Sequence, residues 1–373
     1  MSAGNVKWVK VGNLIEPFDK RNIEGVDYQF YGINKDKTFM PTVADTNNLD
    51  STKYKVVQEG DFVFSGMQTG RDVCIRIALY ADKKPIIISP AYTTFRVNPS
   101  VGIIPEYLFI QFNRFEMDRY GWFLSDGSIR SNLDWDRFCD IEIPLPDITI
   151  QRELVATYNG LKSLAEQNEA LIEPLSKACE AFIVDCKSKY PEVELGGYIE
   201  TFDQINFEGL NYPFYGINKE KTFMPTVADT NNLDNSKYKI VSNGNFVFSG
   251  MQTGRDVCIR IALYNEITPI IVSPAYTTFR VKEDSGILPQ YLFLQFKRLE
   301  MDRYGWFLSD SSVRSNLDWE RFCEIKIPLP PIQIQRSIVN LYNCLEEAKK
   351  IAAEAREKMK TLCPALVQRA ANA

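Results

Sequence analysis

Residues 65–72, Ser-Gly-Met-Gln-Thr-Gly-Arg-Asp, contain the side chains best suited to polar recognition. Gln68 and Arg71 are residue types that form paired hydrogen bonds with base edges, and Thr69 can contact bases or phosphates. The two glycines allow a tight turn with accessible backbone N–H groups. The alternative is a solvated hairpin turn in which Arg71 pairs with Asp72. The segment is not a Walker loop, because no Gly-Lys-Ser/Thr follows.

Residues 126–135, Asp-Gly-Ser-Ile-Arg-Ser-Asn-Leu-Asp-Trp, form a second polar segment. Arg130, Ser131 and Asn132 are candidate contacts to phosphates or bases. In the alternative, Ser131, Asn132 or Asp134 caps the helix that contains the following tryptophan. The two interpretations are compatible.

Three further side chains are candidates. Lys35 and Lys37 belong to a partly basic loop that we expect to be exposed, where they would contact phosphates or simply face solvent. Tyr92 could stack on a base. The alternative for Tyr92 is a place in the core, as for most aromatic residues in strands.

All of the candidate binding residues recur 184 positions later, with no insertion between the copies. Residues 30–80 and 214–264 are identical at 44 of 51 positions. Solenoid repeats have periods of about 20–50 residues, so each copy is a whole domain and not a stacking unit. The second set of candidate binding residues is Lys219, Lys221, Gln252, Thr253, Arg255, Tyr276, Arg314, Ser315 and Asn316.

The elements that position these residues are mostly strands. Short apolar runs rich in β-branched and aromatic residues, bounded by turn residues, predict them. Apolar spacing near 3.6 predicts a helix over 106–117. A short strand over 141–146 should be terminated by its prolines. The predicted strands before that helix cover residues 61–65, 73–80, 85–89 and 92–97.

A heptad pattern follows each β-rich part and predicts a long helix. We therefore divide the chain into β-rich recognition domains at 1–147 and 191–331, and helices at 148–190 and 332–373. Neither helix can bury its apolar stripe alone, so we expect an antiparallel pair separating two domains related by a pseudo-two-fold axis, an α+β fold. The stripes are Leu154, Tyr158, Leu161, Ala165, Ile172, Leu175, Cys179 and Phe182, then Ile338, Tyr342, Leu345, Ala348, Ala352, Ala355, Met359, Leu362 and Leu366.

The composition excludes several kinds of site. The chain has no histidine, which removes Ser-His-Asp triads and histidine general bases, and we find no catalytic constellation. Its 8 cysteines include no Cys-x-x-Cys pair, so we expect reduced thiols and no metal site. No signal peptide is visible, which favours the cytoplasm. A net charge of −5 and a pI near 5.2 argue against nucleic-acid binding unless the basic residues cluster locally.

The order of these features resembles the specificity subunits of type I restriction–modification systems. The likeness rests on the Gly-Asp-Phe-Val-Phe-Ser strand from Gly60 and on the Ile-Pro-Leu-Pro…Gln-Arg junction into each long helix, from Ile143 and again from Ile327. It covers the whole chain. It implies two target-recognition domains that each read half of a split DNA site, and helices that bind two modification (methyltransferase) subunits.

The resemblance also implies that this chain binds no cofactor and is not itself an enzyme. S-adenosylmethionine and ATP would be used by the modification and restriction subunits. The two near-identical domains add the hypothesis of a palindromic target, because two-fold protein symmetry is mirrored in the site. The rivals are a specificity-type protein of a methylation-only system, an acidic DNA mimic that inhibits restriction, and an autonomous enzyme. No continuous run of Asp and Glu supports the mimic.

Overall fold

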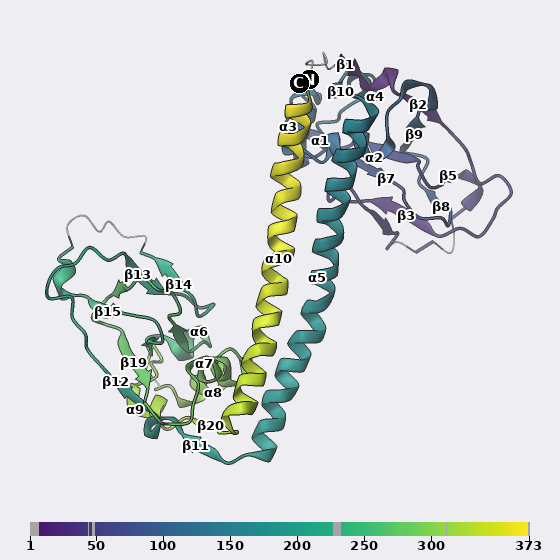
Figure 1. Cartoon of the computed structure of the whole chain (residues 1–373). Coiled ribbons are helices and arrows are strands. Elements are labelled where there is room, and N and C mark those ends of the chain that lie inside the picture. Colours follow the sequence, from purple (N-terminus) through teal and green to yellow (C-terminus); the bar gives the residue numbers. More distant parts are fainter. Residues whose placement is uncertain (1–6, 44, 47–48, 227–232, 311, 372–373) are drawn as a thin grey trace. The chain divides into compact units, whose positions relative to one another are not determined.

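The computed structural model describes residues 7–43, 45–46, 49–226, 233–310 and 312–371, with side chains as far as residue 360. The chain forms two compact units, residues Met1–Asn168 with Lys350–Ala373, and residues Glu169–Lys349. Among the described residues, each unit contains two four-stranded sheets, a two-stranded ribbon, four short α-helices and about half of each of two long helices (Figure 1). The expected mixture of helix with β-rich domains is confirmed.

The first unit is built on a four-stranded antiparallel sheet. Its strand order is β2-β9-β6-β7, and β6 pairs with β7 from Phe62↔Leu79 to Ser65↔Arg76. The second sheet has the order β4-β3-β8-β5, and its central pair β3–β8 is parallel. The strands are β2 (Ile15–Phe18), β3 (Phe30–Ile33), β4 (Phe39–Pro41), β5 (Lys55–Val57), β6 (Phe62–Ser65), β7 (Arg76–Leu79), β8 (Ile86–Ile88) and β9 (Thr93–Val97).

Side-chain alternation along β6 gives the first sheet two buried faces. Phe62 and Phe64 belong to the larger hydrophobic cluster, together with Phe95 and Phe138. Val63, between them, belongs to the smaller cluster, which it shares with residues of the second sheet. Successive side chains of a strand point to opposite faces, so a strand buried on both sides reads as the continuous apolar run that the sequence shows.

Four short helices follow the sheets: α1 (Thr69–Asp72), α2 (Pro105–Phe112), α3 (Phe115–Leu124) and α4 (Trp135–Cys139). The single helix predicted over 106–117 is wrong, because the chain breaks between α2 and α3. Arg114 adopts an extended conformation, with φ −82° and ψ 136°. The carbonyl of Phe112, at the end of α2, accepts a hydrogen bond from the Lys37 ammonium.

A two-stranded ribbon joins the start of the chain to the segment before the first long helix. β1 (Lys7–Lys10) pairs antiparallel with β10 (Glu142–Leu145). Pro144 was expected to end this strand, yet it lies inside β10 and pairs with Trp8. A strand in a two-stranded ribbon has an unpaired edge, where a missing N–H costs no ladder bond.

The glutamine of the Ile-Pro-Leu-Pro…Gln-Arg junction fixes the start of the long helix. Gln151 is fully buried. Its amide nitrogen donates to the carbonyls of Gly102 and Pro146, and its oxygen accepts from the N–H of Ile104 at 2.9 Å. Gln335 makes the same set of bonds in the second copy, at 2.7–2.9 Å. Buried polar groups are stable when they are hydrogen-bonded, so the glutamine of this motif has a structural role at the start of each long helix.

The second unit repeats the first. Its sheets have the orders β12-β19-β16-β17 and β14-β13-β18-β15, with the ribbon β11–β20. The strands are β11 (Glu192–Glu194), β12 (Ile199–Thr201), β13 (Phe214–Ile217), β14 (Phe223–Pro225), β15 (Lys239–Val241), β16 (Phe246–Ser249), β17 (Arg260–Leu263), β18 (Ile270–Val272), β19 (Thr277–Val281) and β20 (Lys326–Pro328). The short helices are α6 (Thr253–Asp256), α7 (Pro289–Phe296), α8 (Leu299–Leu308) and α9 (Trp319–Cys323).

The two long helices are α5 (Ile148–Lys189) and α10 (Ile332–Ala371). The first half of α5 shares a unit with the second half of α10, and the reverse holds in the other unit, as for antiparallel helices that pack together (Figure 1). The predicted stripe of α10 is buried at its leucine and alanines, from Leu345 to Ala355. Leu362 and Leu366 lie outside the described side chains.

The predicted stripe of α5 is wrong at its end. Phe182 is half exposed, and Ile183 and Cys186 are buried instead. Both buried residues join the core of the second unit, in the same cluster as Ile338 of α10. The globular part therefore decides which face of the last turns is covered. No helix of the described chain is long and apolar enough to span a membrane.

Candidate functional site

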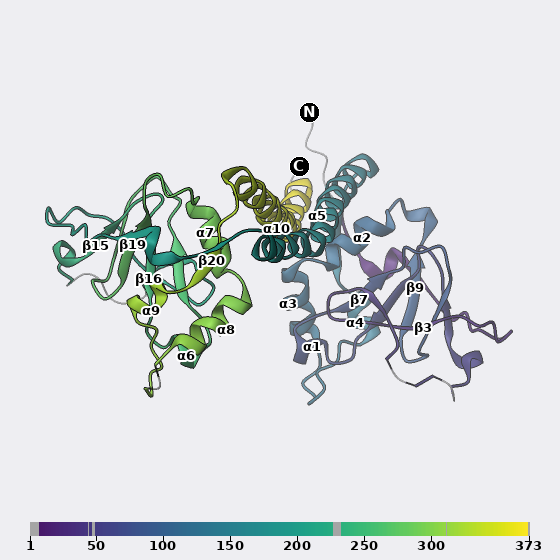
Figure 2. The same ribbon diagram turned by 90° about the horizontal axis from the view of Figure 1, so that it is seen from below.

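The two polar segments singled out in the sequence lie against each other. The N–H of Gly70 donates to the carbonyl of Ser131 at 2.8 Å. The side-chain oxygen of Asn132 accepts from the N–H of Gln68 at 3.0 Å, between residues 64 positions apart. Helix α1 also lies beside α3, as α6 does beside α8 (Figure 2). The two segments therefore form one site.

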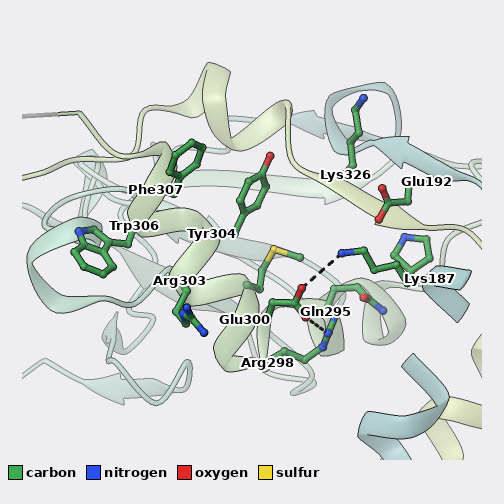
Figure 3. A pocket seen from close by; sticks show the side chains of 12 residues that line it. Lys187, Glu192, Gln295, Arg298, Glu300, Arg303, Tyr304, Trp306, Phe307 and Lys326 are labelled. Carbon is green, nitrogen blue, oxygen red and sulfur yellow. Dashed lines mark hydrogen bonds and ion pairs between the residues drawn. The ribbon is translucent and has the colours of Figure 1, made fainter. Parts of the chain in front are cut away.

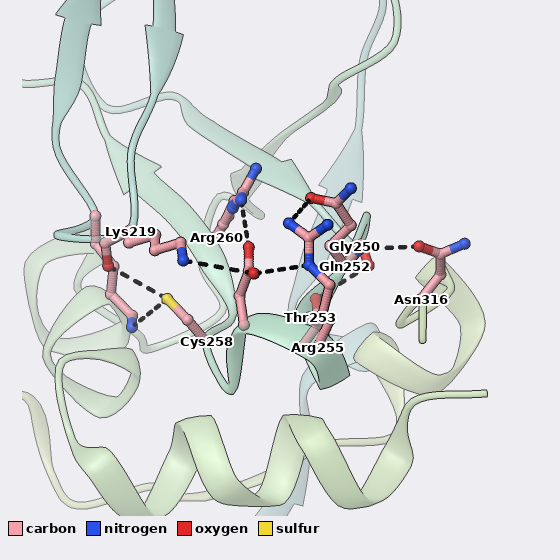
Figure 4. Close-up of polar contacts among 10 residues, drawn as sticks. Lys219, Gly250, Gln252, Thr253, Arg255, Cys258, Arg260 and Asn316 are labelled. Carbon is pink, nitrogen blue, oxygen red and sulfur yellow. Dashed lines mark hydrogen bonds and ion pairs between the residues drawn. The ribbon is translucent and has the colours of Figure 1, made fainter. Parts of the chain in front are cut away.

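The second copy builds the same site. The N–H of Gly254 donates to the carbonyl of Ser315 at 2.8 Å. The side-chain oxygen of Asn316 accepts from the N–H of Gln252 at 2.9 Å (Figure 4). The two copies thus agree in the geometry of this site as well as in its sequence.

Glycines allow the segments to approach closely. A Cβ atom on Gly66 would lie 1.7 Å from the carbonyl oxygen of Leu133, whose N–H donates back to Gly66 at 2.9 Å. A Cβ atom on Gly121 of α3 would lie 2.4 Å from Ile75. No side chain fits at either position, and Gly250 and Gly305 are equally constrained.

The backbone is strained around the site. Gln68 and Val73, on either side of α1, have φ values of 62° and 47°, and Ser131 has φ 51°. A positive φ is uncommon outside glycine and is an outlier for a β-branched residue, with a cost of about 1–3 kcal/mol each. Such strain persists where surrounding contacts enforce it, often at functional sites. The second copy repeats it at Gln252, Val257 and Ser315, with φ 60°, 47° and 51°.

A buried carboxylate organises the cations of the site. Asp72 accepts from Nε of Arg71 at 3.0 Å and also pairs with Arg76. The Lys35 ammonium lies 3.6 Å away. The hydrogen bond from Arg71 lowers the pKa of Asp72 below its ordinary value. Nη2 of Arg71 also donates to Oε1 of Gln68 at 2.7 Å. Asp72 therefore stays ionised and holds three cations together.

The second copy repeats this ionic arrangement around Asp256. Arg255 donates to Asp256 at 3.1 Å and to Gln252 at 2.6 Å, and Lys219 lies 3.4 Å from the same carboxylate (Figure 4). Both lysines of this type are mostly exposed, so the exposed loop position predicted for Lys35 and Lys219 is confirmed.

Lys37 was expected to be exposed as well, and this prediction is wrong. The residue is only 6% exposed, and its ammonium lies 2.8 Å from the carboxylate of Asp118 in α3. Asp118 in turn accepts from the N–H of Ile75 at 2.9 Å. Lys221 repeats the pair with Asp302 at 2.7 Å. These lysines have no access to a phosphate, because they are part of the support beneath the site.

Thr69 is not available either. It is fully buried, and its hydroxyl donates to the carbonyl of Gly66 at 3.1 Å. Thr253 repeats both features, with a distance of 3.0 Å. The prediction that these threonines contact bases or phosphates is wrong, because α1 turns their side chains into the core.

Some of the remaining candidate residues form hydrogen bonds within the site, and others are exposed to solvent. Ser131 and Asn132 bond within the site, as do Ser315 and Asn316. Asp134 caps α4 by accepting from the N–H of Arg137 at 2.9 Å, which confirms one of the two interpretations of that segment. Arg130 and Arg314 are exposed on the same loops. DNA contact by Arg130, Arg314, Lys35, Lys219, Gln68, Gln252, Arg71 and Arg255 stays a prediction.

Tyr92 and Tyr276 are half buried and pack against the smaller hydrophobic cluster of their unit. A Cβ atom on Gly32 would lie 3.2 Å from the Tyr92 hydroxyl, so the end of this side chain lies against β3 of the second sheet. The core interpretation therefore fits these tyrosines better than base stacking.

Sequence reasoning missed a set of exposed aromatic residues on α3. Tyr120, Trp122 and Phe123 are all exposed, although the helix buries Met117 and Gly121. Their counterparts on α8 include Trp306, whose Cδ1 would lie 3.1 Å from a Cβ atom on Gly254. The sequence could have indicated them, because helical spacing places these aromatic residues outside the narrow face of α3 that can be buried.

A groove of about 870 Å³ lies beneath the aromatic residues of the second unit (Figure 3). Arg298 and Lys187 both pair with Glu300 there. Gln295 is buried at its edge, and neither of its amide atoms has a partner. Trp8 and Glu142 stand in the first copy where Glu192 and Lys326 line this groove, so the groove is not part of the duplicated site. No cluster of metal-ligating residues occurs among the residues described.

Comparisons with known proteins find a matching family model in the second copy. Residues 192–357 match the type I restriction modification DNA specificity domain. The first copy repeats that sequence closely. The second copy is therefore similar to the DNA specificity domains of type I restriction–modification systems.

Whole proteins similar to this chain carry the names of specificity subunits. A curated Methanocaldococcus jannaschii protein, assigned as the specificity subunit of the type I restriction enzyme MjaX, is 20% identical over 355 residues, which are 87% of this chain and 80% of that protein. The crystal structure of the type I S subunit from M. genitalium superposes with a TM-score of 0.63 at 15% identity, over 98% of this chain and 96% of that one. The HsdS subunit of Thermoanaerobacter tengcongensis matches 99% of this chain and 97% of its own at 18% identity, with a TM-score of 0.43.

Proposed function

We propose that this chain is the DNA sequence-recognition subunit of a type I restriction–modification complex and that each recognition domain reads one half of a bipartite target. The observation that carries the proposal is the duplicated site, with the same strained backbone and the same ionic contacts in both copies. Exposed arginines with aromatic residues beside them are typical of surfaces that bind nucleic acid.

The local charge of the site is positive, although the pI of the whole chain is acidic. Arg71, Arg76 and Lys35 surround one carboxylate, so the site is cationic although the chain is not. The acidic residues are spread along the chain, since α5 and α10 together carry 10 of the 48 acidic residues and 12 of the 43 basic ones. Binding depends on local patches more than on net charge. We therefore expect weak DNA binding by the chain alone and tighter, salt-sensitive binding with its modification subunits.

The catalytic steps belong to other chains in this proposal. Two modification subunits dock on α5 and α10 and supply the S-adenosylmethionine site and adenine methylation. Restriction subunits supply ATP-driven translocation and cleavage. The chain itself holds neither cofactor. Purified chain with S-adenosylmethionine and target DNA should give no methylation, whereas addition of the modification subunits should give it.

Equal sites predict equal half-sites. The outward residues Gln68, Arg71 and Arg130 are identical to those of the second copy, so the target should be a short sequence, an unspecified spacer and the same sequence inverted. Mapping of methylated adenines in cells that carry this chain and its partners gives both half-sites and the spacer together. Two unrelated half-sites would contradict the palindrome, and an absence of any methylated motif would contradict the proposed function.

A further inference from the structure

In the first domain, Gln68 and Arg71 form a hydrogen-bonded pair at the exposed surface of the site. Nη2 of Arg71 donates to Oε1 of Gln68 at 2.7 Å, while Nε of the same arginine donates to Asp72 at 3.0 Å. The Arg71 side chain is 56% exposed, whereas that of Asp72 is 5% exposed. The carboxylate therefore lies beneath the pair and holds the guanidinium from behind.

The chemistry of arginine settles which way the Gln68 amide faces. A guanidinium has only N–H donors, so the atom that meets Arg71 is the amide oxygen and not the nitrogen. The Gln68 NH₂ group therefore faces elsewhere. Arg71 retains the two N–H groups of Nη1 and one N–H of Nη2. What the pair can offer to a ligand is consequently almost entirely hydrogen-bond donors.

The second copy has the same polarity. Arg255 donates to Oε1 of Gln252 at 2.6 Å and to Asp256 at 3.1 Å (Figure 4). The backbone of Gln252, like that of Gln68, is held at positive φ, and its N–H bonds to an asparagine of the neighbouring loop. The orientation is thus fixed by several independent contacts in each domain.

A donor-only edge selects among bases in the major groove. Guanine presents two adjacent acceptors there, N7 and O6. Adenine presents an acceptor beside a donor, and a glutamine reads it by using both its nitrogen and its oxygen. The oxygen that adenine needs is the atom that Arg71 occupies. Cytosine presents a donor, which would meet the donors of the pair unfavourably.

We propose that the Gln68–Arg71 pair and the Gln252–Arg255 pair each read a guanine through N7 and O6, with Asp72 and Asp256 as the positioning residues. This inference rests on the proposed function and specifies what the site reads. A phosphate would also accept from such donors. A base is favoured because Asp72 offsets part of the positive charge at Arg71, which weakens attraction to a phosphate but leaves hydrogen-bond geometry intact.

The duplication provides an internal control for the test. Arg71→Lys keeps the charge and removes the planar fork, and it changes the first domain only. The full chain with its modification subunits should then lose the preference for guanine at one position of one half-site. The other half-site, read by Arg255, should keep it. The preference should fall by about 5- to 150-fold, as for loss of one bidentate base contact. Asp72→Asn should have the same effect, because it releases the guanidinium.

The measurement is binding of the complex to its mapped target with single bases replaced. Replacement of the inferred guanine by 7-deazaguanine removes the N7 acceptor and should weaken binding. Inosine at the same position alters only the minor groove and should not. A neutral methylphosphonate at the adjacent phosphate distinguishes the backbone alternative, because weakening there without an effect of 7-deazaguanine would overturn the inference.

A matched variant is Arg96→Lys. Arg96 is also an exposed arginine bonded to a buried carboxylate, Asp61 at 3.0 Å, but it lies near the opposite end of β6 from the loop. It should leave the base preference unchanged. A target with no guanine at a common position of the two half-sites would refute the inference and leave the proposed function standing. A complex that binds no DNA selectively would refute the proposed function itself.

Discussion

Gly66 shows how narrowly single residues define the site. A methyl group there would lie 1.7 Å from a backbone carbonyl, and backbone cannot move aside as a long side chain can. We expect Gly66→Ala to separate the two loops and to lower the free energy of unfolding by about 1–3 kcal/mol, the usual cost of overpacking. Methylation should be lost at the half-site that the first domain reads.

Gly127 supplies the control for that prediction. It lies in the same loop as Ser131, and a Cβ atom there would have nothing within 4 Å. Gly127→Ala should leave both thermal unfolding and methylation unchanged. If Gly66→Ala unfolds at the same temperature as the natural protein and methylates both half-sites, the close approach of the two loops has no functional role.

Lys35 and Lys37 show that residue type does not reveal residue role. The two lysines are two positions apart in one loop, and their side chains are 61% and 6% exposed. Lys37 has φ 59° and reaches Asp118, which is 81 positions away. The composition of the loop predicts neither fact. A buried charge is stable only when it is paired, so Asp118 explains why Lys37 can lie inside.

Helix α5 carries apolar residues that its partner helix does not cover. Leu164, Leu171 and Phe182 are all about half exposed. Spacings of 7 and 11 residues place them on one face of a helix, at about 100° per residue. The buried residues Ala165, Cys179 and Ile183 fall on a different face. An exposed apolar stripe of this kind fits the docking of modification subunits.

Charged substitutions in this exposed stripe test whether modification subunits dock on it. Leu171→Glu with Phe182→Glu should abolish assembly with the modification subunits, because two charges would be buried without partners. Both residues are half exposed, so the unfolding temperature of the chain alone should change by little. Lys177→Gln, an exposed change on another face of α5, should leave assembly intact. Size-exclusion chromatography of the mixed subunits measures the result, and normal assembly of the double variant would contradict docking at this stripe.

At the scale of the whole molecule, the absence of histidine governs the response to pH. The chain has no side chain whose ordinary pKa lies near neutrality. The hydrogen bond from Arg71 lowers the pKa of Asp72 below the ordinary aspartate pKa. The ion pairs of Asp72 therefore stabilise the fold fully above the ordinary pKa, and this stabilisation is lost as the pH falls through the lowered pKa. Burial raises the pKa of Cys139 to about 11, so the neutral thiol is kept until the medium is strongly alkaline.

We therefore expect the unfolding temperature to stay nearly constant between about pH 6.5 and 8 at fixed ionic strength. Differential scanning calorimetry across this range checks it. Stability should fall on acidification only when carboxylates such as Asp72 become protonated. Burial raises the pKa of Asp61, so protonation of this group favours the folded state and partly offsets that loss. A shift of many degrees between pH 6.5 and 8 would show that a titrating group has been missed.

The sequence by itself determined the duplication, the β-rich parts and the long helices. A constant offset of 184 residues is visible without structure, and local periodicity predicts strands and helices because each depends on neighbours in the chain. It also identified the two polar segments. It could not show that they form one site, because their hydrogen bonds join residues 64 positions apart.

Only the tertiary structure decided which side chains of the site face outward. It turned Thr69 inward, buried Lys37, divided the predicted helix into α2 and α3, and left the aromatic residues of α3 exposed. It also oriented Gln68 through Arg71 and Asp72. The physical reason is common to all of these. Burial and hydrogen bonding depend on segments distant in sequence, and local patterns do not record how closely such segments approach.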